Sequence, residues 1–432
     1  MRLHSVTSSL NTETHQSSIP YLLYSPHSCV QLKKKEKKKV LTTINSKVNT
    51  KNIIGVNGLQ QLLQHLGQSK STVKTVCIGG INASNVSRVI WQSTARDKSV
   101  DGVAVVSAVM ASKDPEAAAQ ELRRLLRTPP AFGINTVTTE QQDRSPQQLI
   151  DLAVEVICTV SQKRPLSHNM TNLVVQNFAA NVALCVGASP IMANYGEEAR
   201  DLAKLGGALV VNMGTVTPEG VENYLKALEA YNSVGGPVVF DPVGAGATEV
   251  RKSVTKRILG SCYIDVLKGN RAEILSLLPE VAQVQQRGVE SSGDDSGTIS
   301  EELASGIKNL AIRLRNIVVM TGKIDYITAG GQIFAIKNGH EYLGMVTGTG
   351  CCLGTVISAM IAAFTHDKLA ATVAGVLLYN IAAQKAAVRE DVKGPGSFVP
   401  AFLDELYNSR LAALAGHHGW LKDMARVEVL GA

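Results

Sequence analysis

The segment 345–360, MVTGTGCCLGTVISAM, places glycine and cysteine residues in front of a long apolar run. A helix that starts there presents backbone N–H groups without partners and a partial positive charge, which together favour an anion. Gly348 and Gly350 would let this backbone approach an anion closely. The alternative is a tight glycine turn followed by Cys351 as a small buried side chain.

Two further segments place charged side chains directly after apolar runs. Asp241 leaves the run PVVF and enters the turn DPVGAGAT, where a carboxylate is well placed to hold a phosphate-bound Mg²⁺ through water. Lys268, Asn270 and Glu273 follow the run YIDVL and suit the phosphates and metal of a nucleotide. The structural alternatives are an Asp that caps its turn, and an Asn N-cap with Glu273 as its capping-box residue.

Hydroxyl and amide side chains give weaker signals. Thr321 ends the run IVVMT, where its hydroxyl could bracket a phosphate or a ribose. The segment SHNMTNLVVQNFAANVALCVGASPIMA places several amides, among them Asn172, between apolar residues and ends near Met192. Such amides are either buried hydrogen-bonding struts or the polar part of a small-molecule pocket, and we assign Asn172 to the substrate on the second reading.

These side chains require strands that end beside them. From residue 147 onward, helical patterns alternate with apolar strand runs, and three mostly apolar helices follow. The pattern predicts an α/β fold with a parallel or mixed sheet covered by helices on both faces, in which ligands bind at the carboxyl ends of the strands. The same alternation begins at Gly55. A polar link over 128–146 separates the two regions, and we expect disorder in residues 1–50.

Composition limits the classes of function. The chain has 432 residues, 45% of them hydrophobic and 18% charged, which is typical of a soluble globular protein with no membrane-spanning run. The net charge is +7, and the run KKKEKKK at 33–39, with six lysines and one glutamate, supplies +5 of it. This distribution argues against a nucleic-acid-binding surface. Seven scattered cysteines without zinc spacing predict reduced thiols and a cytoplasmic protein.

The segments HNMTNLVVQNFAANVALCVGASPIM, DPVGAGAT, LKGNRAEI, TGKIDYIT, VTGTGCCLG and GPGSF, in this order, resemble hydroxyethylthiazole kinase, a ribokinase-like family. The resemblance covers 147–420 and implies a ribokinase-like three-layer α/β/α kinase domain over 145–432. It implies phosphorylation of the primary alcohol of 4-methyl-5-(2-hydroxyethyl)thiazole by ATP and Mg²⁺, usually in a homo-oligomer such as a trimer. A ribokinase-like kinase of another small alcohol and a catalytically inactive scaffold are the alternatives.

The resemblance also implies roles for single residues. Cys351 matches the catalytic cysteine of the family, and in a first helical turn the dipole would lower the pKa of its thiol so that a thiolate accepts the alcohol proton. Cys352 points elsewhere around the helix and is expected in the core. The family commonly has Arg where this chain has Lys268. Implied thiazole contacts are Met192 and Gly348, implied ATP contacts are Lys268, Thr321 and Gly350, and implied metal ligands are Asp241 and Glu273.

Residues 51–130 resemble the C-terminal part of thiamine-phosphate synthase, a TIM barrel that joins a pyrimidine diphosphate to the thiazole phosphate. The segments VCIGGINASNVSRVI and DGVAVVSAVMASKDPEAAAQEL carry the resemblance and imply phosphate-binding loops at Gly79, Gly80, Val106 and Ser107. A barrel needs about 200 residues at least, and about 130 precede the kinase region. We therefore expect a partial barrel, as in a fungal bifunctional thiamine enzyme with its synthase part truncated, and do not predict synthase activity.

Overall fold

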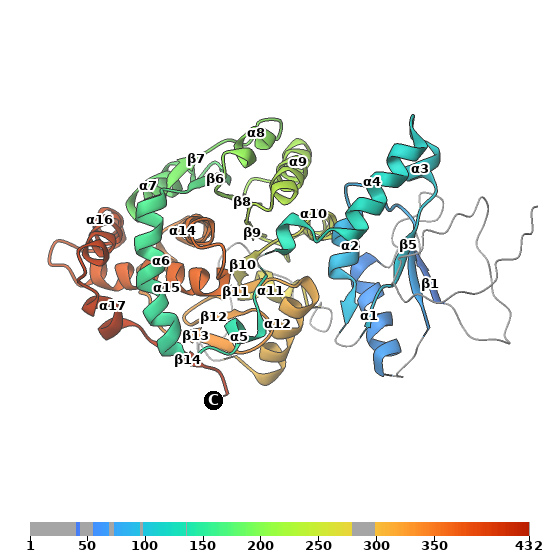
Figure 1. Ribbon diagram of the computed structural model, residues 1–432. Coiled ribbons are helices and arrows are strands. Elements are labelled where there is room, and N and C mark those ends of the chain that lie inside the picture. The colour runs from blue at the N-terminus through green and yellow to red at the C-terminus, as the bar shows by residue number, and fades with distance from the viewer. Residues whose placement is uncertain are drawn as a thin grey trace, which may run out of the picture.

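The computed structural model describes residues 40–43, 55–68, 73–95, 98–134, 136–278 and 299–431 (Figure 1). Most of the segment 1–50, for which disorder was expected, lies outside these residues, as does the Ser- and Gly-rich loop 285–298. One part of that expectation is corrected, because Val40–Thr43 forms strand β1.

The larger body is built on a nine-stranded sheet with the order β14-β13-β12-β11-β10-β9-β8-β6-β7. The pairs from β7 to β11 are parallel, and the pairs that join β11 to β14 are antiparallel. The predicted mixed sheet is therefore confirmed. The strands are β6 (Leu166–Met170), β7 (Ser189–Ile191), β8 (Ala208–Asn212), β9 (Val238–Asp241), β10 (Val266–Asn270), β11 (Ile317–Thr321), β12 (Asp325–Thr328), β13 (Ile333–Ile336) and β14 (Val427–Val429).

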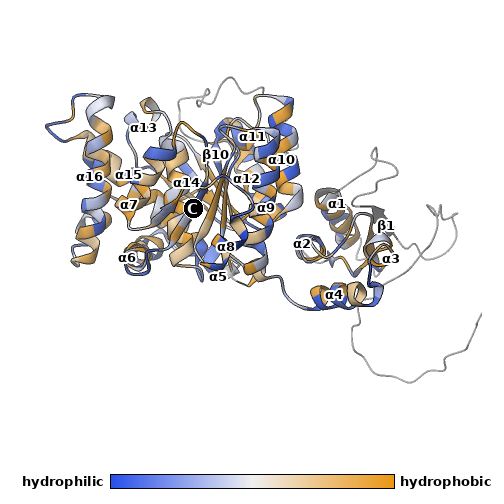
Figure 2. Ribbon diagram, turned by 90° about the horizontal axis from the view of Figure 1, so that it is seen from above, coloured by the Kyte–Doolittle hydropathy of each residue, from blue (hydrophilic) through white to orange (hydrophobic). Residues whose placement is uncertain are grey.

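Helices cover both faces of this sheet, because successive side chains of its buried strands point to opposite faces. On β8, Val210 belongs to the core on one face, while Leu209 and Val211 belong to the core on the other. The strands lie as an apolar layer between the helices (Figure 2). One face is covered by α6 (Pro146–Lys163), α7 (Gln176–Val186), α14 (Thr349–Ala363), α15 (Lys368–Ala387), α16 (Pro395–Leu414) and α17 (Gly419–Met424), and the other by α8 (Ala199–Lys204), α9 (Pro218–Val234), α10 (Glu249–Ser261), α11 (Arg271–Leu275) and α12 (Glu301–Leu314).

Local sequence signals set the ends of several helices. Ser145 and Gln148 form a capping box at the start of α6, where Pro146 occupies the first turn. The Thr217 side chain caps α9 in front of Pro218. Helix α7 starts at Gln176, after strand β6 and a short loop.

Helix α15 is the central helix of the core. By length and composition it is apolar enough to cross a membrane, but 89% of its apolar window is buried within the fold. It packs against α6, α14 and α16. A helix that is apolar on all sides and surrounded by other helices is a buried core helix of a globular domain.

The smaller body contains a parallel sheet with the order β1-β2-β5, and its strands β2 and β5 are Thr75–Ile78 and Gly102–Ala104. Its apolar core joins this sheet to α1 (Gly55–Gln68), α2 (Val86–Gln92) and α4 (Pro115–Arg127), and the Asp114 side chain caps α4. The described part of this sheet has three strands, whereas a closed barrel needs eight. Among the described residues of the whole chain, the remaining strands and α-helices are β3 (Thr94–Ala95), β4 (Lys98–Ser99), α3 (Ser107–Met110), α5 (Thr139–Gln142) and α13 (Tyr342–Met345).

Polar contacts join the smaller body to the ends of two helices of the larger body. The Arg315 guanidinium lies 3.8 Å from the centre of the Trp91 ring and donates to the Trp91 carbonyl oxygen at 2.6 Å. The Gln60 side chain donates to the Arg313 carbonyl oxygen at 2.8 Å, and Arg88 donates to the carbonyl oxygen of Gly260. These contacts fall just before β10 and β11, at the amino ends of both strands.

Candidate active site

The carboxyl ends of the central strands bring the predicted charged residues together. Asp241 is the last residue of β9 and Lys268 lies on the neighbouring strand β10. The Lys268 Nζ atom is 3.1 Å from Asp241 Oδ2, and their side chains are 3% and 2% exposed. Lys268 also donates to the Gly350 carbonyl oxygen at 2.9 Å, which places the start of α14 beside this ion pair.

Two asparagines extend the ion pair to the predicted catalytic cysteine. The Asn212 amide donates to Asp241 Oδ2 at 2.9 Å, and its oxygen accepts from the Asn172 amide at 3.0 Å. The same Asn172 amide lies 3.5 Å from the Cys351 Sγ atom. The Asn172 oxygen in turn accepts from two backbone N–H groups, so the whole side chain is held within the protein. We therefore expect Asn172 to position Cys351, while its predicted contact with the substrate stays a prediction.

The start of α14 has an open glycine-rich backbone. Gly348 is left-handed, with φ at +91°, and a Cβ atom there would lie 2.8 Å from Val175 Cγ2. A Cβ atom on Gly350 would meet no atom within 4 Å. The Tyr379 hydroxyl donates to the Thr349 carbonyl oxygen at 2.7 Å and fixes the first turn from the adjacent helix α15. The first turn of α14 is thus held by Tyr379 on the side of α15, while the side on which a Gly350 Cβ atom would stand is open.

The environment of Cys351 corrects one expectation. Burial, followed by the negative charge of Asp241, raises the pKa of the Cys351 thiol to about 11, although Lys268 and two asparagine side chains act in the opposite direction. The expected lowering of this pKa by the helix dipole is wrong, because burial and a neighbouring carboxylate outweigh the dipole. Cys352 is fully buried in the core, as expected.

Glu273 combines a structural and an electrostatic role. It forms the predicted capping box of α11 with Asn270, and its second oxygen accepts from the Gly244 backbone N–H group at 2.9 Å. Burial and the charge of Asp241 raise the pKa of Glu273 to about 7, against the opposing effect of Lys268 and two backbone N–H groups. At this pKa, burial and Asp241 together outweigh the stabilisation of the carboxylate by Lys268.

The donor set at this position fits a magnesium ion held partly by other ligands. Among the described residues there is no group of three or more His, Cys, Asp or Glu side chains that could hold a metal by themselves. Asp241 and Glu273 supply two carboxylates that interact electrostatically. Mg²⁺ commonly uses one or two carboxylates and takes its remaining ligands from phosphates and water. The arrangement therefore fits a metal that arrives with a nucleotide.

The other predicted residues occupy several places. The Thr321 hydroxyl lies at the end of β11 and donates to the Gly269 carbonyl oxygen at 3.3 Å, close to Lys268. Met192 follows β7 and packs, partly buried, against the core beneath α14. In the smaller body, Gly79 and Gly80 follow β2, and Val106 and Ser107 follow its parallel neighbour β5, so all four lie at one edge of that sheet. Their phosphate-binding role stays a prediction.

Sequence reasoning missed two residues that support the site. Asn212 ends the apolar strand β8, and the rule that selected Asp241 would have found it. The Arg251 guanidinium donates to the carbonyl oxygens of Met213 and Val243, each at 2.6 Å, and so joins the loops after β8 and β9. Arg251 lies in a charged stretch of α10, where no sequence signal separates it from a solvent-exposed residue.

The fold and the site together define a ribokinase-like α/β protein with its polar groups at the carboxyl ends of parallel strands. The model of the hydroxyethylthiazole kinase family matches residues 157–411. The chain belongs to this family.

Individual relatives agree with this assignment. The chain is 37% identical to the "probable thiamine biosynthetic bifunctional enzyme" of Schizosaccharomyces pombe over 386 residues, which covers 87% of this chain and 72% of that protein. It is 43% identical to the hydroxyethylthiazole kinase of Moorella thermoacetica over 58% of this chain and 90% of that protein. The solved structure of a hydroxyethylthiazole kinase protein from Pyrococcus horikoshii has a TM-score of 0.56 and 37% identity, with 65% of this chain and 99% of that chain covered. The resemblance inferred from the motifs is confirmed.

The two glycines at the mouth of α14 should respond differently to alanine. Gly348→Ala forces a left-handed alanine against Val175 and should lower the free energy of unfolding by about 1–3 kcal/mol. Gly350→Ala meets no atom and lies within a helix, so it should leave stability unchanged or raise it by up to about 1 kcal/mol. Urea unfolding of both variants measures the difference, and equal stability losses would contradict the described conformation.

Proposed function

We propose that the protein catalyses the ATP-dependent phosphorylation of the primary alcohol of 4-methyl-5-(2-hydroxyethyl)thiazole, a step in thiamine biosynthesis. The observation that carries this proposal is the meeting of the α14 N-terminus with the buried Asp241–Lys268 pair and Cys351. Membership of the hydroxyethylthiazole kinase family supports the thiazole as the acceptor.

The proposed phosphoryl transfer consists of three changes at the reacting atoms. A new bond forms between the alcohol oxygen and the γ-phosphorus, the bond from that phosphorus to ADP breaks, and the alcohol proton must leave. In this proposal the backbone N–H groups at the start of α14 receive the charge on the moving phosphoryl group, and each good donor is worth about 3 kcal/mol. Lys268 supplies a buried positive charge beside the same turn.

Cys351 is the proposed acceptor of the alcohol proton. Only a thiolate takes that proton, and the fraction of thiolate depends on the local charges. Burial and Asp241 raise the pKa of the thiol and Lys268 lowers it, so these three effects together set the basicity and availability of the sulfur. The amide of Asn172 holds the Sγ atom in place.

We further propose that Mg²⁺ binds with the nucleotide at Asp241 and Glu273. A bound magnesium ion would neutralise negative charge on the β- and γ-phosphate oxygens. The electrostatic interaction between Glu273 and Asp241 supports the proposal, because it places two carboxyl groups near one another and a cation there would stabilise both carboxylates. The Gly244 and Asn270 N–H groups orient this carboxylate and thereby fix where the ion would sit.

Substitution of Cys351 tests the proposed reaction. Cys351→Ala should lower kcat by about 100-fold or more with little change in the KM for ATP, because proton acceptance is lost and the phosphate contacts remain. Cys351→Asp should retain more activity than the alanine variant. The measurement is ADP formation that depends on added thiazole alcohol, with hydroxymethylpyrimidine as the comparison alcohol.

Cys352→Ala is the matched control for this substitution. Its side chain is fully buried beside Cys351 and packs in the core, so the variant should lose some stability while keeping its turnover. Equal kcat values for the wild type and Cys351→Ala would remove the thiol from the reaction. ADP formation with the pyrimidine alcohol alone would contradict the proposed acceptor.

The dependence on pH tests the magnesium site. Below its pKa of about 7 Glu273 is protonated, and only its carboxylate attracts a cation. The Mg²⁺ concentration that gives half-maximal activity should therefore fall by about tenfold as the pH rises from about 6 to about 8. Glu273→Gln keeps a residue suited to the capping box, and should show weaker and pH-independent magnesium activation.

An exposed carboxylate serves as the control for this measurement. Glu249 lies in the first turn of α10 with its side chain 88% exposed, so Glu249→Gln should keep the pH profile of the wild type. An identical pH profile for the wild type and Glu273→Gln would exclude Glu273 as the titrating group.

We also propose that copies of the chain assemble beside the site. Large apolar side chains are exposed on segments that flank Gly348 and Met192, and exposed apolar side chains that form a contiguous patch mark an interaction surface. Val174→Glu should give a smaller species by light scattering and reduce activity, whereas Val234→Glu, at the far end of α9, should change neither. A wild-type monomer would contradict the proposal. The exposed side chains are Leu173, Val174, Leu184, Tyr195 and Met345.

A further inference from the structure

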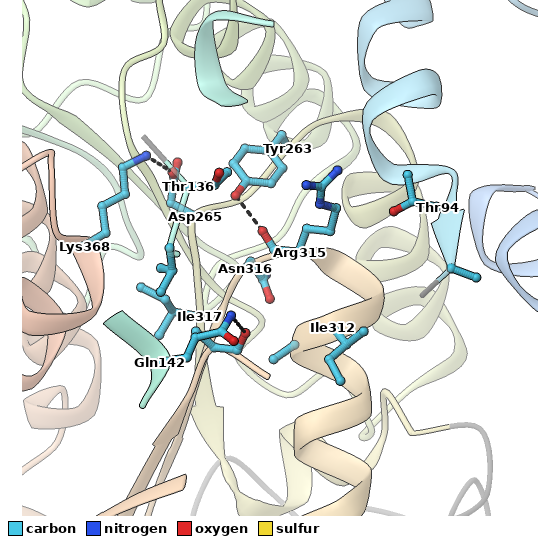
Figure 3. A pocket seen from close by; sticks show the side chains of 14 residues that line it. Thr94, Thr136, Gln142, Tyr263, Asp265, Ile312, Arg315, Asn316, Ile317 and Lys368 are labelled. Atoms are coloured by element: carbon cyan, nitrogen blue, oxygen red, sulfur yellow. Dashed lines mark hydrogen bonds and ion pairs between the residues drawn. The ribbon is translucent and has the colours of Figure 1, made fainter. Parts of the chain in front are cut away.

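A cavity of about 310 Å³ lies between the smaller body and the amino ends of the central strands (Figure 3). Strand β3 and the link over 136–142 form one side of it, and the residues that precede β10 and β11 form the other. An apolar cavity of about 150 Å³ holds a benzene molecule. This cavity therefore has room for an aromatic ring with substituents.

The cavity is lined by a buried side chain that lacks hydrogen-bond partners. Asn316 is 5% exposed, and neither its Nδ2 nor its Oδ1 atom has a partner among the described residues. Its backbone N–H group donates to the Ala311 carbonyl oxygen at 3.1 Å, which fixes the position of the residue after α12. Buried amides nearly always pair, because leaving one unpaired is costly. An occupant of the cavity would supply the missing partners.

The rest of the lining limits the chemistry of that occupant. Ile312 and Ile317 provide apolar surface, which suits the faces of a ring. Asp265 and Lys368 form a buried ion pair at 2.5 Å on one side, and the Arg315 guanidinium stands on the other, stacked on Trp91. The free carboxamide offers a donor beside an acceptor. Such an amide recognises a planar edge that carries the reverse pair, as asparagine does with adenine.

We propose that this cavity binds a planar nitrogen heterocycle that presents a ring-nitrogen acceptor beside an exocyclic amino donor, with Asn316 as its hydrogen-bonding partner. The edge of an aminopyrimidine has this chemistry. It occurs in thiamine and its phosphates, and also in the adenine ring of nucleotides. The two sources are separated by the experiment below.

The cavity is separate from the candidate active site. Asn316 directly precedes β11, whereas Thr321 is the last residue of that strand. The five residues of β11 span about 16 Å. Asp265 directly precedes β10, and Lys268 is the middle residue of that strand. A substitution at Asn316 therefore tests the cavity without touching the residues proposed for phosphoryl transfer.

Fluorescence of Trp91 reports on the cavity, because its ring contacts Arg315 in the lining. Trp420 is the second tryptophan of the chain, so the full-length Trp420→Phe protein leaves Trp91 as the one reporter. The probes are thiamine, thiamine monophosphate and adenosine. The thiazole alcohol, which lacks an aminopyrimidine, is the negative control. We expect a saturable change with at least one aminopyrimidine probe and none with the control.

Asn316→Leu removes the amide and keeps the size of the side chain. It should weaken binding of the active probe at least tenfold, raise the melting temperature of the free protein, and leave kcat and both KM values unchanged. Asn309→Leu, on the exposed face of α12, is the matched control and should bind like the parent protein. Binding of adenosine at the kinase site would persist in Asn316→Leu, so the component lost in this variant belongs to the cavity.

The outcomes separate clearly. Binding of thiamine or its phosphate that Asn316→Leu abolishes supports a thiamine-type ligand, and the same loss for adenosine alone supports a nucleotide. The proposal is overturned if no aminopyrimidine changes the Trp91 signal at millimolar concentration. It is also overturned if Asn316→Leu binds as tightly as Asn309→Leu. Kinase activity is measured separately in every variant, so the failure of one proposal does not imply the failure of the other.

Discussion

The buried ion pair between Asp241 and Lys268 is the interaction on which the site depends. Removing two charges from water costs several kcal/mol for each ion, and their mutual attraction offsets this cost only when the remaining hydrogen bonds are satisfied. Here Asn212 donates to the carboxylate, and the Gly350 carbonyl oxygen accepts from the ammonium group. The pair contributes little net stability in such a balance. Its main effect is to hold the ends of β9 and β10 and the start of α14 at one point.

The order of the strands explains why these groups meet. Parallel strands β8 to β11 are neighbours in the sheet, so their carboxyl ends share one edge. Asn212 is directly in register with Asp241, and Asn270 with Thr321. Residues far apart in the sequence thus become neighbours because the backbone pairing fixes them. Side-chain hydrogen bonds then fix the loops that follow the strands, as when Arg251 joins the loops after β8 and β9.

Features that depend on residues close together in the sequence could be predicted from it, whereas features that depend on contacts between distant residues could not. The capping box of Asn270 and Glu273 depends on residues three apart, and the alternation of strands and helices depends on local periodicity, so both were predictable. The pKa of Cys351 was not, since the dipole of its own helix is a local effect while burial and Asp241 come from the folded chain. Strand β6 carries no apolar strand pattern in the sequence, because Ser167 and Asn169 are buried polar residues that pair with Ser358 and Thr355.

The smaller body contacts the larger one at the amino ends of the central strands, opposite the end that carries the candidate active site. Its contacts with Gly260, Arg313 and Arg315 fall on the last turns of α10 and α12 and the residue that follows, which lead into β10 and β11 at their amino ends. The charged and polar groups proposed to bind phosphate lie further along these strands, from Lys268 in the middle of β10 to Thr321 at the carboxyl end of β11. A parallel α/β sheet keeps its amino edge free for attachment, because its ligands bind at the carboxyl edge. A second body can therefore be joined to the kinase fold there without disturbing the charged groups around Lys268, and residues of both bodies line the cavity at this junction.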